Sequence, residues 1–138
     1  MPFLKEGRNI MDAYHAVKNY FDALVTGDAP RLIGMMSSAD YYVKIGTDAG
    51  EFVEGGENAI DYYRQHVAST EDFTIQFEHL DVNERGNIAW FYTRQIWRLK
   101  WQGVFEDIAM RMTGVLEKED GTWKFVQIHA SMGVPFRG

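Results

Sequence analysis

The stretch Val115-Leu-Glu-Lys-Glu-Asp-Gly-Thr-Trp-Lys-Phe-Val126 decides the fold class of this chain. Asp120-Gly121 stands between two runs of β-favouring residues, and this dipeptide suits a tight hairpin turn with positive φ angles. Similar turn signals occur at Glu84-Arg85-Gly86 and at Gln102-Gly103. We therefore expect a meander of antiparallel strands over residues 73–83, 87–101, 105–119 and 122–134.

Helical periodicity fills the first part of the chain. From Asn9 to Val25 apolar residues recur three and four positions apart, which is typical of an amphipathic helix. Gly27 suits the end of this helix, and Asp28 suits the cap of a short second helix through residue 36. A short hairpin over residues 41–54 and a third helix ending near Ser69 follow. Helices followed by strands predict one α+β domain over residues 1–138, with the N-terminal helices in the concave face of a strongly curved antiparallel sheet.

Composition argues against several classes of partner. The net charge of -6 and the absence of clustered Lys and Arg disfavour nucleic acid. Without cysteine there is no disulfide or thiolate chemistry, and no motif with metal-ligand or nucleotide-binding spacing is present. No run approaches the roughly 18 apolar residues of a membrane span, and the start of the sequence lacks the apolar run of a signal peptide. We expect a cytoplasmic protein with no cofactor, no metal and no membrane partner.

Alternation along the last two strands assigns their side chains to two faces. One set is strongly apolar and is expected to line the concave face: Ile108, Met110, Met112, Leu116, Val126, Ile128, Ala130 and Met132. The opposite set mixes charge with aromatic area, as a subunit interface does: Asp107, Arg111, Thr113, Trp123, Gln127, His129 and Ser131. We therefore predict a homodimer through this second face. A bulge in either strand would exchange the two faces beyond it.

Two side chains are candidates for moving a proton. Asp48 lies in a glycine-flanked turn near the expected pocket rim and is the best single carboxylate for a general base, although Asp is also an ordinary turn residue. His66 lies on the third helix, where it would reach the pocket mouth or occupy the helix surface. His129 and Ser131 share a face, but the alternation directs both to the expected dimer interface.

Several segments together carry a family resemblance. They are Asn19-Tyr-Phe-Asp-Ala-Leu-Val-Thr-Gly-Asp28, Ile45-Gly-Thr-Asp48, Gly55 before a helix, and Asp120-Gly-Thr-Trp-Lys-Phe-Val-Gln-Ile-His-Ala-Ser131. Over nearly the whole chain they resemble the SnoaL-like branch of the nuclear-transport-factor-2-like superfamily. The resemblance implies a cone-shaped α+β fold, a pocket at the open end and frequent dimers. Members include polyketide cyclases, ketosteroid isomerases, dehydratases and non-catalytic assembly modules, so no single activity is implied.

The resemblance also indicates which catalytic residues are present. Tyr20 matches the helix position that supplies the oxyanion-hole tyrosine in the steroid isomerases. Their base would fall at Gly46 and Thr47, with Asp48 one step away, and their partner acid would fall near Gly114. Two of the three parts are therefore missing, and steroid isomerisation is not expected.

By the same analogy, one face of the strand over residues 87–101 turns inward. Trp90, Tyr92 and Arg94 alternate on that face, and a guanidinium among aromatic rings binds carboxylates or enolates and stacks on planar ligands. In the alternative interpretation the two rings fill the core and Arg94 pairs with Glu106 or Asp107. The predicted ligand-binding set is Tyr14, Trp90, Tyr92, Arg94, Met110, Met112 and Ile128.

Three functions remain open from the sequence. The first is a small dimeric SnoaL-like protein that binds a small apolar, carboxylate- or carbonyl-bearing molecule in the cone pocket. The second is an enzyme of the polyketide cyclase or isomerase type, with Tyr20 and either Tyr92 or Arg94 stabilising an enolate while Asp48 or His66 moves the proton. The third is a non-catalytic assembly domain.

Overall fold

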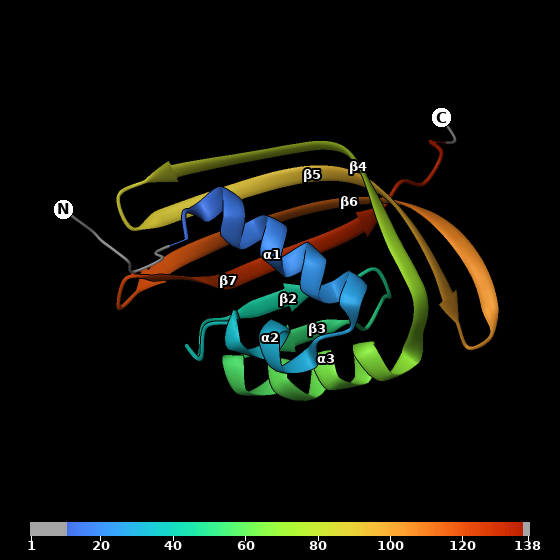
Figure 1. The fold of residues 1–138 in the computed structure, drawn as a ribbon, viewed down its shortest axis with the longest axis horizontal. Coiled ribbons are helices and arrows are strands. Elements are labelled where there is room, and N and C mark those ends of the chain that lie inside the picture. The colour runs from blue at the N-terminus through green and yellow to red at the C-terminus, as the bar shows by residue number, and fades with distance from the viewer. Residues whose placement is uncertain (1–10, 137–138) are drawn as a thin grey trace.

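A helical layer packs into the concave face of a six-stranded, strongly curved sheet (Figure 1). The computed structural model describes residues 11–136. Its helices are α1 (Ala13–Thr26), α2 (Ala29–Gly34) and α3 (Gly56–Ser69). Its strands are β2 (Val43–Ile45), β3 (Phe52–Glu54), β4 (Thr70–Arg85), β5 (Ile88–Trp101), β6 (Val104–Glu119) and β7 (Thr122–Met132). The strand order is β3-β2-β7-β6-β5-β4, and neighbours are antiparallel except β2 and β7. The predicted α+β class and the curved sheet are confirmed.

Gly27 and Asp28 act at the helix ends as predicted, whereas the cap at the start of α1, Asp12, was not predicted. The side chain of Asp12 accepts a hydrogen bond from the His15 N–H at 2.8 Å, so α1 begins after Asp12. Gly27, with φ of 70°, ends α1 in the left-handed conformation. The predicted helix start at residues 9 and 10 lies outside the described residues, but Met11 and Asp12 are not helical, so α1 begins later than predicted. The second helix is shorter than predicted, because Met36 instead forms a parallel bridge with Phe125 of β7.

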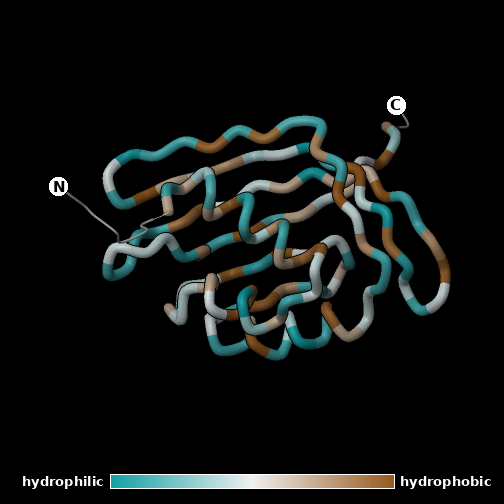
Figure 2. Tube along the Cα trace, viewed as in Figure 1, coloured by the Kyte–Doolittle hydropathy of each residue, from teal (hydrophilic) through white to brown (hydrophobic). Residues whose placement is uncertain are grey.

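Two of the predicted turns have the positive φ angles that tight hairpins require. Gln102 and Gly103 have φ of 51° and 87°, and Asp120 and Gly121 have φ of 50° and 80°. Each joins two strands directly, so the long strands form the expected meander. Hydropathy alternates along parts of these strands (Figure 2). This alternation is expected of strands that turn one face toward the helices and the other face outward. None of the helices within residues 11–136 is both long and apolar enough to cross a bilayer.

The core lies between α1 and the sheet. The Tyr20 ring packs 4.9 Å from that of Phe125, and Phe21 contacts the ring of Phe77 edge-on at 5.5 Å. Phe91 and Leu116 complete this layer from β5 and β6, and both are almost wholly buried. The core fills the narrow end of the cone, which leaves the pocket toward the other end of the sheet.

The facing of β5 is opposite to the prediction. Antiparallel partners point to the same side of a sheet, and the inward-facing Met110 and Met112 pair with Gln95 and Thr93. The odd-numbered residues of β5 from Ala89 to Leu99 are therefore buried, and Trp90, Tyr92 and Arg94 lie on the outer face. The prediction that they face the pocket is wrong.

A bulge in β7 changes the facing of Trp123. Val115 pairs with Gln127 but Leu116 pairs with Phe125, so Val126 is an extra residue in β7. Before the bulge the odd-numbered side chains point inward, and Trp123 is buried in the core at 4% exposure. The prediction that Trp123 belongs to an outer interface is wrong, and the bulge is the physical reason.

Candidate functional site

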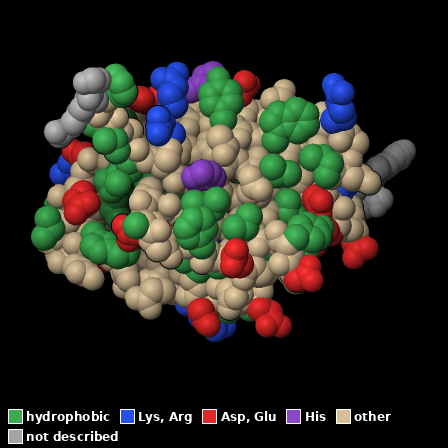
Figure 3. All heavy atoms as spheres, turned by 180° about the vertical axis from the view of Figure 1, so that it is seen from behind, with side chains coloured by type: hydrophobic (Ala, Val, Ile, Leu, Met, Phe, Trp, Pro, Cys, Tyr) green, Lys and Arg blue, Asp and Glu red, His purple; other side chains and the backbone are tan. Residues whose placement is uncertain are grey.

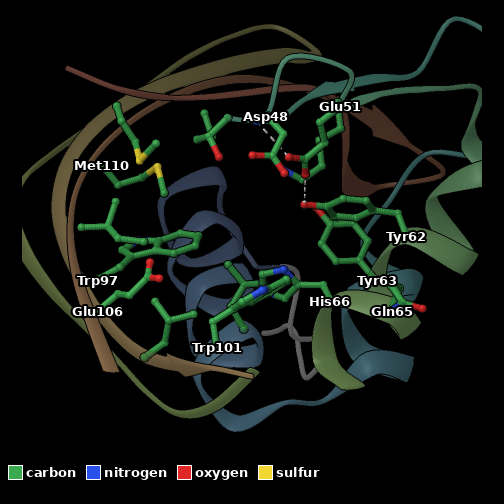
Figure 4. Close-up of a pocket in the computed structure, with 18 of the residues that line it drawn as sticks. Asp48, Glu51, Tyr62, Tyr63, Gln65, His66, Trp97, Trp101, Glu106 and Met110 are labelled. Carbon is green, nitrogen blue, oxygen red and sulfur yellow. Dashed lines mark hydrogen bonds between the residues drawn. The ribbon is translucent and has the colours of Figure 1, made fainter. Parts of the chain in front are cut away.

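The concave side of the sheet holds a pocket of about 480 Å³, a size typical of small-molecule sites. The ends of β5, β6 and β7 form a mainly apolar wall, and α3 with the loop after β2 forms a polar wall opposite (Figure 4). The apolar wall comprises Trp97, Leu99, Trp101, Ile108, Met110, Ala130 and Met132, with Leu24 from α1. The polar lining comprises Tyr20, Lys44, Gly46, Thr47, Asp48, Glu51, Tyr62, Tyr63, Gln65, His66 and Glu106.

Two buried tyrosines form a hydroxyl pair in the lining. Tyr20 on α1 and Tyr63 on α3 lie with their Oη atoms 2.8 Å apart, and both side chains are almost wholly buried. Burial raises the pKa of each hydroxyl well above its usual range, so both are protonated at neutral pH. One O–H is donated within the pair. The Tyr42 hydroxyl, which donates to the Met36 Sδ at 3.2 Å, also lies close enough to Tyr63 for a hydrogen bond that lowers the pKa of Tyr42. When Tyr63 donates to Tyr20, the Tyr20 proton remains for an oxygen atom of a bound ligand.

Glu51 is fixed against the pocket wall by two hydrogen bonds. The Tyr62 hydroxyl donates to Oε2 at 2.7 Å, and the backbone N–H of Asp48 donates to Oε1 at 3.3 Å. The Glu51 carboxylate fits here because residue 46 is a glycine. A Cβ atom on Gly46 would lie 2.0 Å from the Glu51 carboxyl carbon. Burial raises the pKa of Tyr62 far above its usual range, and the charge of Glu51 raises it further. Tyr62 is therefore a neutral donor to a carboxylate.

Lys44 is a buried cation in the same wall. It lies on β2 with 5% of its surface exposed, and its Nζ is 5.0 Å from the centroid of the Tyr62 ring. Burial lowers the pKa of Lys44 to about 8, and the negative charge of Glu51 opposes this shift. Within residues 11–136 the amine makes no hydrogen bond and no ion pair. Buried lysines are usually paired, so this one is chemically unusual.

His66 faces the pocket from α3 as a neutral imidazole. Burial lowers the pKa of His66 to about 4, and the nearby positive charge of Lys44 contributes to the shift. Its ring stacks on that of Tyr62 with centroids 6.1 Å apart. Its buried Nε2 has no hydrogen-bond partner in the described part of the chain. A neutral imidazole offers one acceptor and one donor, so His66 can interact with a polar ligand group.

The structure brings four of the predicted site residues together in this pocket. Tyr20, Asp48 and His66 line it, as does Met110. Their functional roles remain predictions. Among the described residues, no group of three or more His, Asp or Glu side chains is placed to hold a metal ion.

The other predicted ligand-binding residues lie elsewhere. Met112 and Ile128 point inward but belong to the filled core, so they do not line the pocket. Tyr14 is 45% exposed, because α1 turns its Ala13, Ala16 and Val17 face inward instead. On the outer face, Arg94 is opposite Arg111, and Asp107 pairs with Arg98 at 3.1 Å. The alternative prediction of an Arg94 pair with Asp107 is therefore also wrong.

Four of the predicted interface residues do lie on the outer face of the sheet. Arg111, Gln127 and His129 are exposed and Ser131 is half-buried, and the Arg111 Nε donates to the Ser131 Oγ at 3.1 Å. Seen from behind, hydrophobic side chains lie among charged ones over this face (Figure 3).

Sequence reasoning missed the charged wall of the pocket. Lys44, Glu51, Tyr62 and Trp97 were not singled out. The sequence carried no signal for the burial of Lys44, because the alternation Val43-Lys44-Ile45 by itself indicates an outward lysine. Nothing local indicated that Glu51 would fold back over Gly46.

The architecture and the pocket define a cone-shaped α+β fold, which is shared with solved structures described as NTF2-like and as having a cystatin-like fold. A family model for the SnoaL-like domain matches residues 14–135. The chain therefore belongs to the SnoaL-like domain family. No curated protein matches the sequence.

Solved structures with this fold are similar in shape but distant in sequence. A candidate dehydratase of the NTF2-like family from Streptomyces avermitilis has a TM-score of 0.79 at 18% identity, covering 88% of this chain and 94% of that one. A candidate calcium/calmodulin-dependent protein kinase II association domain from Xanthomonas campestris has a TM-score of 0.74 at 19% identity, covering 89% and 86%. A ketosteroid isomerase-like protein from Erwinia carotovora atroseptica has a TM-score of 0.72 at 18% identity, covering 88% and 94%. At these identities the likeness establishes the fold alone.

Proposed function

We propose that the chain binds a small, largely apolar carbonyl compound in the cone pocket. The single observation that carries the proposal is the Tyr20–Tyr63 hydroxyl pair in the lining of a pocket that has an aromatic and aliphatic wall. The free proton of that pair is a donor for a carbonyl oxygen, and Trp97 and Trp101 offer flat surfaces to the rest of the ligand. Three carboxyl groups and one lysine line the pocket, which favours a neutral carbonyl over a carboxylate.

Binding is tested with a ketone and its parent hydrocarbon. The fluorescence of Trp97 and Trp101 is titrated with 1-tetralone and with tetralin, which differ in the carbonyl group only. Tyr20→Phe and Tyr63→Phe each remove a hydroxyl worth about 0.5–1.5 kcal/mol, so the affinity for the ketone falls about two- to tenfold. Tyr92→Phe, on the outer face, is the matched control. Equal affinity for ketone and hydrocarbon, or unchanged ketone affinity in both pocket variants, would overturn the proposal.

A second candidate function is acid–base catalysis at the same carbonyl. It is favoured by the presence of Asp48 and of the unpartnered Nε2 of His66 in the lining that also holds the tyrosine pair. The names of the dehydratase and the ketosteroid isomerase-like neighbour agree with such chemistry. A carboxylate would take a proton from the carbon beside the carbonyl, and the tyrosine hydroxyls would stabilise the enolate.

The two candidates differ in proton exchange. Bound 1-tetralone in D2O is followed by NMR for replacement of its α-hydrogens by deuterium. Catalysis predicts exchange that is lost in Asp48→Asn or His66→Gln and kept in Tyr92→Phe. If the ketone binds but its α-hydrogens exchange no faster than without protein, catalysis is refuted and the chain is a non-catalytic binding protein.

We also propose that the chain is a homodimer through the outer face of the sheet. Trp90 and Tyr92 are 41% and 46% exposed there, beside Arg111 and His129, and isolated monomers rarely expose such aromatic area. Light scattering of the wild type should give twice the chain mass, and Tyr92→Glu should give the monomer mass. A monomeric wild type would overturn this assignment, which is independent of the pocket.

A further inference from the structure

We propose that the amine of Lys44 forms a reversible imine with an aldehyde or ketone bound in the pocket. The inference rests on the proposed carbonyl binding and adds covalent capture to it. Three observations carry it. Lys44 lines the pocket, its side chain is almost fully buried, and within the described residues its amine has no hydrogen bond or ion pair.

The neighbours of Lys44 explain why its amine remains unpaired. Glu51 is the nearby carboxylate, and its two oxygens already accept from the Tyr62 hydroxyl and the Asp48 N–H. The Tyr62 ring lies 5.0 Å from the amine. Desolvation without an ion pair favours the neutral amine, which is the nucleophilic form. At pH 7 a lysine with a pKa of about 8 is neutral in about a tenth of the molecules.

The reaction needs only the amine, the carbonyl compound and protons. The Nζ lone pair attacks the carbonyl carbon, a C–N bond forms, and the oxygen takes up a proton to give a carbinolamine. The nitrogen loses one proton and the hydroxyl takes up another, so that water leaves as the C–O bond breaks and the nitrogen lone pair forms the C=N bond. The iminium nitrogen then loses its remaining proton to give the imine. The sum is amine plus carbonyl giving imine plus water, with no change of oxidation state.

Protons for these steps are supplied within the pocket. The Tyr20–Tyr63 pair stabilises the oxygen as the carbinolamine forms, and the imidazole of His66 has a free acceptor for the proton that nitrogen loses. The titratable groups that line the pocket with Lys44 come from α1, the loop after β2, α3 and β6. They are Tyr20, Asp48, Glu51, Tyr62, Tyr63, His66 and Glu106.

Reductive trapping tests the proposal. The intact protein is incubated at pH 7.5 with 1-naphthaldehyde and cyanoborohydride, and each labelled lysine is identified by peptide mass spectrometry. Lys44 should be labelled at least ten times faster than the surface Lys18, and excess 1-tetralone should slow labelling at Lys44 alone. The labelling rate at Lys44 should rise from pH 6 to pH 9, because only the neutral amine reacts.

Lys44→Met and Lys44→Arg are the matched variants. Both should bind 1-naphthaldehyde in the fluorescence titration without borohydride, and neither should form the pocket adduct. If the wild type binds the aldehyde but Lys44 is labelled no faster than Lys18, the imine is refuted while the proposed function stands. If neither aldehyde nor ketone binds, both proposals are refuted.

Discussion

Replacing Lys44 by methionine is expected to stabilise the protein at neutral pH. Methionine has a similar length and no charge, so it keeps most of the contacts of this buried side chain and removes an unpaired cation. A pKa that falls from the ordinary 10.5 to about 8 on folding corresponds to a penalty of about 3 kcal/mol at pH 7.

Proton binding determines how this penalty depends on pH. Below pH 8 both folded and unfolded chains hold the Lys44 proton, and the full penalty applies. Between about pH 8 and 10.5 the folded chain has released the proton and the unfolded chain still holds it, so stability rises with pH. From pH 7 to pH 9 the wild type regains about 1 kcal/mol, and Lys44→Met lacks this gain.

Urea unfolding at pH 7, 8 and 9, followed by circular dichroism, measures the effect. In the difference in unfolding free energy between wild type and Lys44→Met, the pH-dependent contributions of the other titrating groups cancel. Lys18→Met, on the exposed side of α1, reports the effect of losing a surface lysine. A difference that stays constant across this pH range, or a wild type more stable than Lys44→Met at pH 7, would refute the reasoning.

Three further predictions concern glycines and tryptophans. Gly46→Ala should displace the Glu51 carboxylate and so lower the pKa of Lys44 further. NMR of the Lys44 side chain would then show titration at a lower pH than in the wild type, and an unchanged titration would contradict the prediction. Gly114→Ala should cost about 1–3 kcal/mol in urea unfolding, because its Cβ would lie 2.4 Å from the Phe91 ring; a neutral effect would contradict this. Trp123→Ala should cost about 3–5 kcal/mol and Trp90→Ala much less, and equal losses of stability would contradict the assigned facing.

Gly114 also shows why part of the family chemistry is absent. The resemblance places the partner acid of the steroid isomerases near this residue. A side chain there would meet Phe91 and the backbone oxygen of Gln127 within 3 Å. The site therefore has no room for an acid, and the polar groups that line this pocket come instead from α1, β2 and the loop after it, α3 and the start of β6.

Local physics made the elements predictable. Asp12, Gly27 and Asp28 act at the helix ends through short-range hydrogen bonds and backbone preferences, although only the two later signals were recognised in the sequence. Gln102-Gly103 and Asp120-Gly121 specify turns by their own φ preferences. The α+β class and the curved meander follow from these signals and from hydrophobic periodicity.

The facing of β5 was also contained in the sequence but was not extracted from it. A two-residue turn at Gln102-Gly103 places Trp101 opposite Val104, so inward Met110 and Met112 require inward Gln95 and Thr93. The family analogy was followed instead, and it placed the even-numbered side chains inward.

By itself the sequence determined the elements, their order and the tight turns, because these depend on neighbours within a few residues. Asp48 and His66 were pocket candidates from their places in a turn and on a helix, and Tyr20 from the family resemblance. Tertiary structure alone decided the rest. The extra residue Val126 is invisible until β7 pairs with β6, and its bulge buries Trp123. Lys44 and Tyr62 are 18 positions apart and meet only when β2 packs beside α3. Burial then changes the proton affinity of Lys44, and burial is a property of the whole fold.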